Sequence, residues 1–280
     1  MSTLEDYLKQ TKDLTIMPPV LLSVLTLKDD NEMHFSQLEK MVESDQILVS
    51  RMLRMANSPF YSRGNRVQNI RQIIGRLGFK TVRSMVAMAF VDSIFSAGNY
   101  KKFRQEVWQH SIATGIMAGL LCEDLGLKKH QDSSLLGGLL QDLGKIILNT
   151  IDRKKYIQVL TTYLDSDKTI RELEMEHFKV DNVQMGEASE KHWKIPIEIV
   201  EIIAGHHDDI AKQKVHVQIV AFSDLLARKA GFGKVEPATE ETYSNYLDVL
   251  GIAPNKREQM PERFRMRLME DELYKFCSAL

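Results

Sequence analysis

Two aspartates and three histidines are the residues of this chain whose types and positions could support chemistry. The histidines are His110 and the adjacent pair His206 and His207, and the aspartates are Asp142 and Asp224. Imidazole nitrogens and carboxylate oxygens together form the ligand set that proteins use for zinc, iron or manganese. Such sites are built in helical bundles from side chains on facing helices. The five residues are therefore the candidate metal ligands.

The histidines also have a structural explanation when each is taken alone. His110 shares one helical face with Met117 and Leu121, so it can be a hydrogen-bonded histidine of the core. The pair His206–His207 ends an apolar helical stretch, where a histidine can interact with the helix dipole.

The two aspartates are harder to explain as isolated core residues. Asp142 follows the apolar face that contains Leu139, and Asp224 shares a face with Val220. A lone buried carboxylate is unfavourable unless it is paired, protonated or bound to a cation. Two acids and three histidines on the inward faces of four separate helices therefore favour one shared site.

A basic interval is the second chemical feature of the sequence. No acid lies between Asp45 and Asp92, although the formal net charge of the whole chain is −1. From this interval we select four arginines as candidates for binding an anion, a nucleotide, a nucleic acid or an acidic partner, because guanidinium groups match phosphate and carboxylate. They are Arg51, Arg54, Arg63 and Arg66. The alternative is that they face solvent or neutralise acids elsewhere in the chain.

Hydrophobic spacing predicts that these residues are positioned by helices. Ser36 and Glu39 form a candidate capping box, and Asp45 is the candidate N-cap of the next helix, which Pro59 terminates. Further helices are predicted over residues 69–78, 81–95, 102–122, 134–150, 152–164, 168–176, 183–192, 196–207, 215–230 and 261–279. The fold class is therefore all-α, with a boundary between two lobes near 97–101.

Composition limits the class of protein. A chain of 280 residues with 44% hydrophobic content can bury a sizeable core. Its two cysteines belong to no paired motif, which is typical of a reducing compartment. No window has the roughly 18 to 20 apolar residues that span a bilayer. We therefore expect a cytoplasmic protein that has no membrane partner.

Several strings in family order resemble the HDOD family, the HD-related output domains of bacterial signalling proteins. In the first lobe they are Met17–Val20, Ser44–Leu48, Arg54–Tyr61 and Ile73–Gly78. In the second lobe they are Trp108–Ser111, Gly137–Lys145, His192–Pro196 and Gly205–His207. The resemblance covers about residues 12 to 230, and the combination of strings is more specific than any one of them.

The resemblance implies that the second lobe is similar to HD-type phosphohydrolases, whose metal set is a histidine, a His-Asp dyad and a later aspartate. His110 matches the first histidine, Asp142 the aspartate of the dyad, and Asp224 the last aspartate. The dyad histidine is replaced by Gln141. A glutamine offers an amide oxygen where imidazole offers a strong nitrogen donor, so this replacement weakens the metal set.

Some relatives use further histidines to hold a second metal. His206 and His207 match such positions, but the histidine expected near residue 182 is Asn182. With amides at both Gln141 and Asn182, a clamp of two metals lacks ligands. The resemblance thus implies either no cofactor or a single divalent metal, namely Fe, Mn, Zn or Mg.

The same resemblance implies an architecture and a function. It divides the chain into an N-terminal helical lobe over 1–98, packed on an HD-like helical bundle over 99–233, and a C-terminal helical extension over 234–280. It implies a non-catalytic signalling module with a degenerate metal site, acting through protein partners of a signalling pathway or through a ligand. The alternative is a metal-dependent phosphohydrolase that acts on a nucleotide or a phosphodiester.

Overall fold

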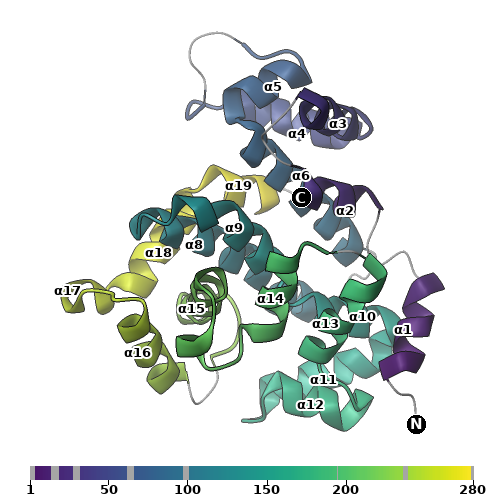
Figure 1. Cartoon of the computed structure of the whole chain (residues 1–280), viewed down its shortest axis with the longest axis vertical. Coiled ribbons are helices and arrows are strands. Elements are labelled where there is room, and N and C mark those ends of the chain that lie inside the picture. Colours follow the sequence, from purple (N-terminus) through teal and green to yellow (C-terminus); the bar gives the residue numbers. More distant parts are fainter. Residues whose placement is uncertain are drawn as a thin grey trace. The chain divides into compact units, whose positions relative to one another are not determined.

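The computed structural model describes residues 4–13, 19–27, 32–61, 66–96, 101–193, 195–235 and 239–278. Within these ranges every regular element is a helix, so the predicted all-α class is confirmed (Figure 1). The chain forms two compact units. The large unit comprises residues 1–16 and 97–269, and the small unit comprises residues 17–96 and 270–280.

The small unit is arranged around one apolar helix. Its helices are α2 (Pro19–Thr26), α3 (Glu32–Glu43), α4 (Gln46–Ala56), α5 (Ile70–Leu77), α6 (Phe79–Ser96) and α19 (Glu272–Ser278). The described part of α6 is apolar on most of its circumference, and α2, α5 and α19 all pack on it. Asp45 caps α4 by accepting hydrogen bonds from the backbone N–H groups of Ile47 and Leu48, at 2.9 and 3.0 Å, as its sequence position predicts.

The large unit has α15 (Val215–Lys229) at its centre, packed against α8, α9, α14 and α16 (Figure 1). Its other elements before α15 are α1 (Leu4–Asp13), α7 (Lys101–Phe103), the π-helical turn η1 (Arg104–Gln109), α8 (His110–Asp124), η2 (Lys128–His130), α9 (Gln131–Leu140), α10 (Leu143–Ile151), α11 (Arg153–Asp165), α12 (Ile170–Phe178), α13 (Asn182–Trp193), α14 (Ile197–Gly205) and η3 (Ile210–Lys212). After α15 come α16 (Thr239–Val249), α17 (Pro254–Arg257) and α18 (Met260–Glu270).

The observed helices differ from the predicted ones in several places. The helix predicted over 261–279 is two helices, α18 and α19, which Asp271 separates, and the helix predicted over 102–122 is interrupted by η1. The helix predicted over 134–150 is two helices, α9 and α10, which are separated by a turn at Gln141 and Asp142. The apolar pattern runs on through this turn, so spacing alone does not reveal it. The capping box predicted at Ser36 lies inside α3, which already begins at Glu32.

The compact units place the two ends of the chain as follows. Helix α1 belongs to the large unit, and α19 belongs to the small unit. The division into three domains stays a prediction. The predicted boundary between residues 98 and 99 falls within 97–100, outside the described residues. Among the helices that the structure describes, none combines the length and the apolar character that crossing a bilayer requires.

Close backbone contact holds α10 against α13 beside the candidate site. A Cβ atom added to Gly144 would lie 1.7 Å from the carbonyl oxygen of Asn182. Only a glycine at position 144 permits this approach, and residue 144 is two positions from Asp142. The contact therefore fixes the start of α10 and with it the turn that carries Asp142.

Replacing Gly144 by alanine is expected to destabilise the protein by about 1–3 kcal/mol or more, because a backbone atom must move to admit the methyl group. Gly75 is the matched control, since a Cβ there meets nothing within 4 Å. Gly75→Ala should be neutral or stabilising by up to about 1 kcal/mol, because alanine favours the helix. Urea denaturation followed by circular dichroism measures both, and equal stabilities would contradict the expectation.

Candidate metal site

The candidate ligands lie at ends and breaks of helices in the large unit. His110 is the first residue of α8 and directly follows the π-helical turn η1, a kind of turn that is frequent at functional sites. Asp142 lies in the turn between α9 and α10, and His206 and His207 follow the end of α14. Asp224 lies within α15. All are buried except His207, which reaches the surface.

His110 and Asp224 form a closed contact in the core. The Nε2 atom of His110 lies 2.6 Å from Oδ1 of Asp224, and its Nδ1 atom lies 2.7 Å from the carbonyl oxygen of Phe232. Both ring nitrogens thus face protein oxygens, so in this arrangement neither points to an open position for a metal.

Arg228 supplies a fixed cation to Asp224. Its Nε donates to Oδ2 of Asp224 at 3.2 Å, and its Nη2 donates to Oδ1 at 3.3 Å. The guanidinium is held in place because Nη1 donates to the hydroxyl of Tyr163 and to the carbonyl oxygen of Lys234. Burial alone would raise the pKa of Asp224, but Arg228 and His110 hold it well below its usual range.

Gln141 completes this network as a donor. Its Nε2 atom donates to Oδ1 of Asp224 at 3.1 Å, which is the orientation that an ionised carboxylate requires of an amide. The Oε1 atom of Gln141 is buried without a hydrogen-bond partner. Asp224 therefore accepts from three side chains, and we call His110, Gln141, Asp224 and Arg228 the ion-pair network.

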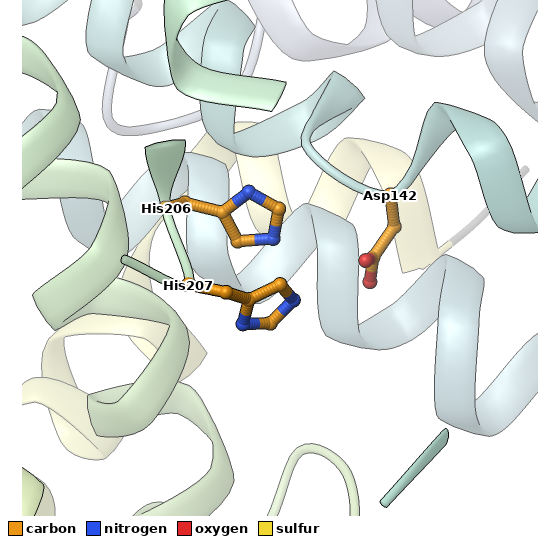
Figure 2. A group of neighbouring side chains, drawn as sticks. All are labelled: Asp142, His206 and His207. Atoms are coloured by element: carbon orange, nitrogen blue, oxygen red, sulfur yellow. The ribbon is translucent and has the colours of Figure 1, made fainter. Parts of the chain in front are cut away.

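The remaining three candidates form a second group beside the ion-pair network, close enough for His110 and Asp224 to influence the pKa of Asp142. Asp142, His206 and His207 each place one ligand atom so that all three atoms lie within 4.8 Å of one another. Figure 2 shows the carboxylate of Asp142 facing the two imidazoles, whose ring centroids are 3.9 Å apart. We call these residues the three-residue cluster. Two imidazoles and one carboxylate are a common ligand set for a single Zn²⁺ or Fe²⁺ ion.

His206 is oriented as metal-binding histidines are. Its Nδ1 atom donates to the carbonyl oxygens of Ile202 and Ile203, at 2.9 and 3.1 Å, which fixes the tautomer with a lone pair on Nε2. That Nε2 atom is buried and has no hydrogen-bond partner. Burial lowers the pKa of His206, although Asp142 and Asp224 oppose the change, so its imidazole is kept neutral for ligation.

Lys145 lies against the other side of the cluster. Its Nζ atom is 2.8 Å from Oδ1 of Asp142, and both side chains are buried. Burial would raise the pKa of Asp142, but Lys145, His110 and His206 lower it to about 2. The ammonium keeps Asp142 ionised, and it also occupies one side of the carboxylate that a metal would bind.

Asn182 donates hydrogen bonds to another buried acid, Glu174. Its backbone N–H and its Nδ2 both donate to Oε2 of Glu174, each at 2.7 Å, while the hydroxyl of Tyr156 donates to Oε1 of Glu174 at 2.7 Å. Burial raises the pKa of Glu174 to about 7, and Lys145, Tyr156 and Asn182 moderate the rise. The amide at position 182 thus anchors α13 to α12.

The raised pKa of Glu174 predicts a pH dependence of stability. The pKa is about 7 in the folded chain and about 4.3 in an unfolded chain, so the folded state binds a proton more tightly. Stability from this group is full below about pH 4.3 and is lost as the pH rises towards 7, by at most roughly 1.4 kcal/mol per pH unit. Glu174→Gln should remove this slope in urea denaturation between pH 4.5 and 7. An unchanged slope would show that Glu174 does not titrate there.

Comparison with known proteins identifies the family. The family model of the HDOD domain matches residues 14–209, which is more than half of the chain. The chain belongs to the HDOD family. The resemblance found in the sequence is thereby confirmed.

Solved structures agree with this assignment of the fold. An HDOD domain protein of unknown function from Geobacter sulfurreducens is 22% identical, with a TM-score of 0.76 over 99% of this chain and 95% of that one. A protein from Marinobacter aquaeolei, provisionally described as a signal transduction protein, is 21% identical, with a TM-score of 0.73 over 97% of this chain and 60% of that one. At these identities the likeness shows the fold alone.

Among curated proteins, ribonuclease Y of Streptococcus agalactiae is 25% identical over 81% of this chain and 33% of its own length. An uncharacterised protein of Treponema pallidum is 20% identical over 77% of this chain and 42% of its own length. The chain thus spans less than half the length of these relatives.

This HDOD domain divides its five predicted ligands into two groups. We expected one remnant site in which His110, Asp142 and Asp224 hold a single metal with a neighbouring histidine. In the structure His110 and Asp224 are joined in the ion-pair network, and the ligand atoms that lie within 4.8 Å of one another are those of the three-residue cluster. Binding of one metal by the predicted set stays a prediction.

Sequence reasoning missed the cations that determine this division. Arg228 follows Asp224 by four positions and Lys145 follows Asp142 by three, which are helical spacings at which opposite charges meet. Either pair could have been found by searching for a base at those spacings after each buried acid. Glu174 gave no such signal, because its partners Tyr156 and Asn182 are distant in sequence.

A pocket of about 540 Å³ lies beside the cluster and has His207 in its wall. Its wall includes Thr169, Met175 and Glu176 of the α12 region, and an ion pair between Arg171 and Asp181 at 2.7 Å. This HDOD domain therefore retains an open approach to one histidine of the cluster.

Two of the four arginines selected for anion binding line one pocket. Arg51 and Arg54 are on α4 and line one pocket of the small unit. Arg66 is exposed in the segment before α5 and is absent from that pocket wall. Arg63 lies outside the described residues.

Proposed function

We propose that this HDOD domain is a non-catalytic signalling module whose HD-type site has become largely structural. The observation that carries the proposal is the ion-pair network. The carboxylate of Asp224, which matches the last aspartate of the HD metal set, accepts from His110, Gln141 and Arg228. A metal at Asp224 would have to displace a buried guanidinium.

Two further contacts support a loss of hydrolysis. Gln141 turns its amide nitrogen towards Asp224, so at the position of the dyad histidine the chain presents a hydrogen-bond donor. Asn182 commits both of its nitrogens to Glu174. A mechanism with two metals needs strong ligands for both ions, and in place of two imidazoles these positions offer only neutral amide oxygens, Oε1 of Gln141 and Oδ1 of Asn182.

The three-residue cluster is suited to one divalent cation. His206 would ligate it through Nε2, Asp142 through its carboxylate and His207 from the side of the pocket, because these atoms converge and Nε2 of His206 is otherwise unpartnered. A bound cation of this kind would act as a Lewis acid towards a ligand oxygen. In a regulatory module the same ion would link His206 and His207 at the end of α14 to the turn at Asp142.

The signalling role is supported by the solved relative from Marinobacter aquaeolei, which is provisionally described as a signal transduction protein. We propose that the domain acts by binding protein partners or a ligand, and that its output is a change in that binding. The family membership supports the same role.

Hydrolysis assays test the proposal. The full chain should be incubated with bis(p-nitrophenyl) phosphate and with a short RNA, in the presence of Mn²⁺, Fe²⁺, Zn²⁺ or Mg²⁺, beside the variant Asp142→Ala. We expect the two proteins to give the same background. Turnover that is present in the parent chain and lost in Asp142→Ala would overturn the proposal.

The alternative is a metal-dependent phosphohydrolase that acts on a nucleotide or a phosphodiester. It is favoured by the free Nε2 of His206, by the pocket beside His207, and by the similarity to a protein named ribonuclease Y. It requires stoichiometric metal in protein purified without chelator. Elemental analysis that finds none, together with an unchanged melting temperature in EDTA, would exclude it.

A further inference from the structure

The small unit contains a pocket of about 210 Å³ whose first wall is one face of α4 and the residues that follow it. Arg51, Arg54, Met55 and Ser58 recur at the spacing of helical turns, so their side chains lie on one side of the helix. Arg54 is exposed, Arg51 is half-buried and Met55 is buried. This wall presents two guanidinium groups above an apolar base.

Helix α19 forms the second wall, through Glu272, Lys275 and Phe276. Phe276 is buried and continues the apolar base begun by Met55. Lys275 is half-exposed, and its Nζ atom lies 2.7 Å from Oε1 of Glu272. The pocket is therefore lined by three cations and one anion, and the anion is already paired.

Ser58 adds a polar group that lacks a partner. Its Oγ atom is buried and makes no hydrogen bond, although its backbone N–H donates to the carbonyl oxygen of Met55 at 3.0 Å. A buried hydroxyl without a partner is unfavourable. A hydroxyl in a wall with two arginines can donate to an oxyanion, and such a bond would relieve that cost.

We propose that this pocket binds a small organic phosphate, a phosphate monoester that carries one compact organic group. The phosphate would meet Arg51, Arg54 and Lys275, because guanidinium groups bind phosphate through paired N–H donors. The organic group would lie on Met55 and Phe276. The volume of about 210 Å³ is below the roughly 300–1,000 Å³ of pockets for drug-sized ligands, which favours a small ligand over a peptide segment.

This inference goes beyond the proposed function. Every residue that lines the pocket belongs to the small unit, whereas the ion-pair network and the three-residue cluster belong to the large unit. The pocket can bind its ligand whether or not the large unit hydrolyses anything. The outcome of the hydrolysis test therefore bears only on the proposed function, and the outcome of the binding test bears only on the pocket.

Calorimetric titration of the full chain tests the proposal with three probes: inorganic phosphate, glucose 6-phosphate and adenosine 5′-monophosphate. We expect at least one ester to bind more tightly than inorganic phosphate, because only an ester covers the apolar base. Preference for adenosine 5′-monophosphate would identify a nucleotide, and preference for glucose 6-phosphate would identify a sugar phosphate. No binding of either ester at about 10 mM, or equal affinity for all three probes, would overturn the proposal.

Variants of exposed or partly exposed arginines locate the site without unfolding the protein. Arg51→Ala and Arg54→Ala should each weaken binding of the ester by roughly tenfold or more, since each removes a charge-assisted hydrogen bond. Arg71→Ala is the matched control, because Arg71 is an exposed arginine of the same unit outside the pocket wall. Equal losses in all three variants would show a diffuse charge effect and would overturn the proposal.

Two further variants have effects that a structural role does not predict. Glu272→Gln leaves Lys275 without its paired anion and should tighten binding roughly threefold. Ser58→Ala should weaken binding roughly fivefold while leaving the melting temperature unchanged or higher, because it removes a hydroxyl that is unpaired without ligand. Weaker binding in Glu272→Gln, or unaltered binding in Ser58→Ala, would contradict the assigned geometry.

Discussion

Replacing Arg228 by methionine is expected to destabilise the protein by about 3–5 kcal/mol at pH 7, because it leaves the buried carboxylate of Asp224 without its fixed cation. The side chains of Arg228 and Asp224 are 7% and 6% exposed, so water cannot replace the lost partner. Arg228 also donates to Tyr163 and to the carbonyl oxygen of Lys234, and those acceptors lose a donor as well. Urea denaturation at pH 7 measures the change.

Arg267→Met is the matched control for this prediction. Arg267 also pairs with acids of the large unit, at 2.7 Å from Asp124 and 3.3 Å from Glu123, but its side chain is 30% exposed. A surface pair of this kind contributes only about 0–1 kcal/mol. If the two variants lose the same stability, Arg228 is not the group that compensates Asp224.

The destabilisation caused by Arg228→Met should also depend on pH. The pKa of Asp224 is depressed in the folded chain, so the stability it contributes is present above its unfolded value of about 3.9 and is lost as the pH falls further. The difference between the parent chain and Arg228→Met should therefore shrink below about pH 4. The double variant Arg228→Met with Asp224→Asn should recover part of the lost stability at pH 7, because neither buried charge remains.

The ion-pair network shows how a buried aspartate can be kept in a fold without a bound metal. A metal ion or a guanidinium beside Asp224 would each offset the free-energy cost of burying its carboxylate. Once Arg228 is in place, Asp224 is needed for the fold even when it binds no metal. The persistence of His110, Asp142 and Asp224 in this sequence is thus compatible with a site that no longer catalyses.

Helical spacing was sufficient to predict the inward side chains of the site. The faces assigned to His110, Asp142 and Asp224 are buried as expected, and Asp45 caps its helix through its own carboxylate. These properties depend on residues within one or two turns of helix. The local sequence is therefore sufficient to predict them.

The division of the site into two groups could not be predicted in the same way. The turn at Gln141 and Asp142 lies within a continuous apolar pattern, because the neighbouring α9 and α10 are both buried. The π-helical turn before His110 has no marker in composition. The assignment of α1 and α19 to their units depends on contacts that are distant in sequence.

Replacing His206 by alanine is expected to weaken Zn²⁺ binding by at least roughly 100-fold. Loss of a group that merely supports a ligand costs about 10–100-fold in metal affinity, and loss of a ligand should reach or exceed the upper end. Competition with a chromophoric chelator measures the affinity of the full chain. His130→Ala is the control, since His130 is a histidine of the large unit outside the three-residue cluster.

Lys145→Met should change zinc binding in the opposite direction, because the Nζ atom of Lys145 competes with a cation for Oδ1 of Asp142. The variant should be less stable than the parent chain without zinc, since Asp142 loses its paired ammonium. It should also gain more in melting temperature when zinc is added, because an ion that binds only the folded state stabilises that state more when its affinity is higher. Equal zinc affinities in the parent chain, His206→Ala and Lys145→Met would mean that the ion binds elsewhere, and the convergence of Asp142, His206 and His207 would then be a feature of packing.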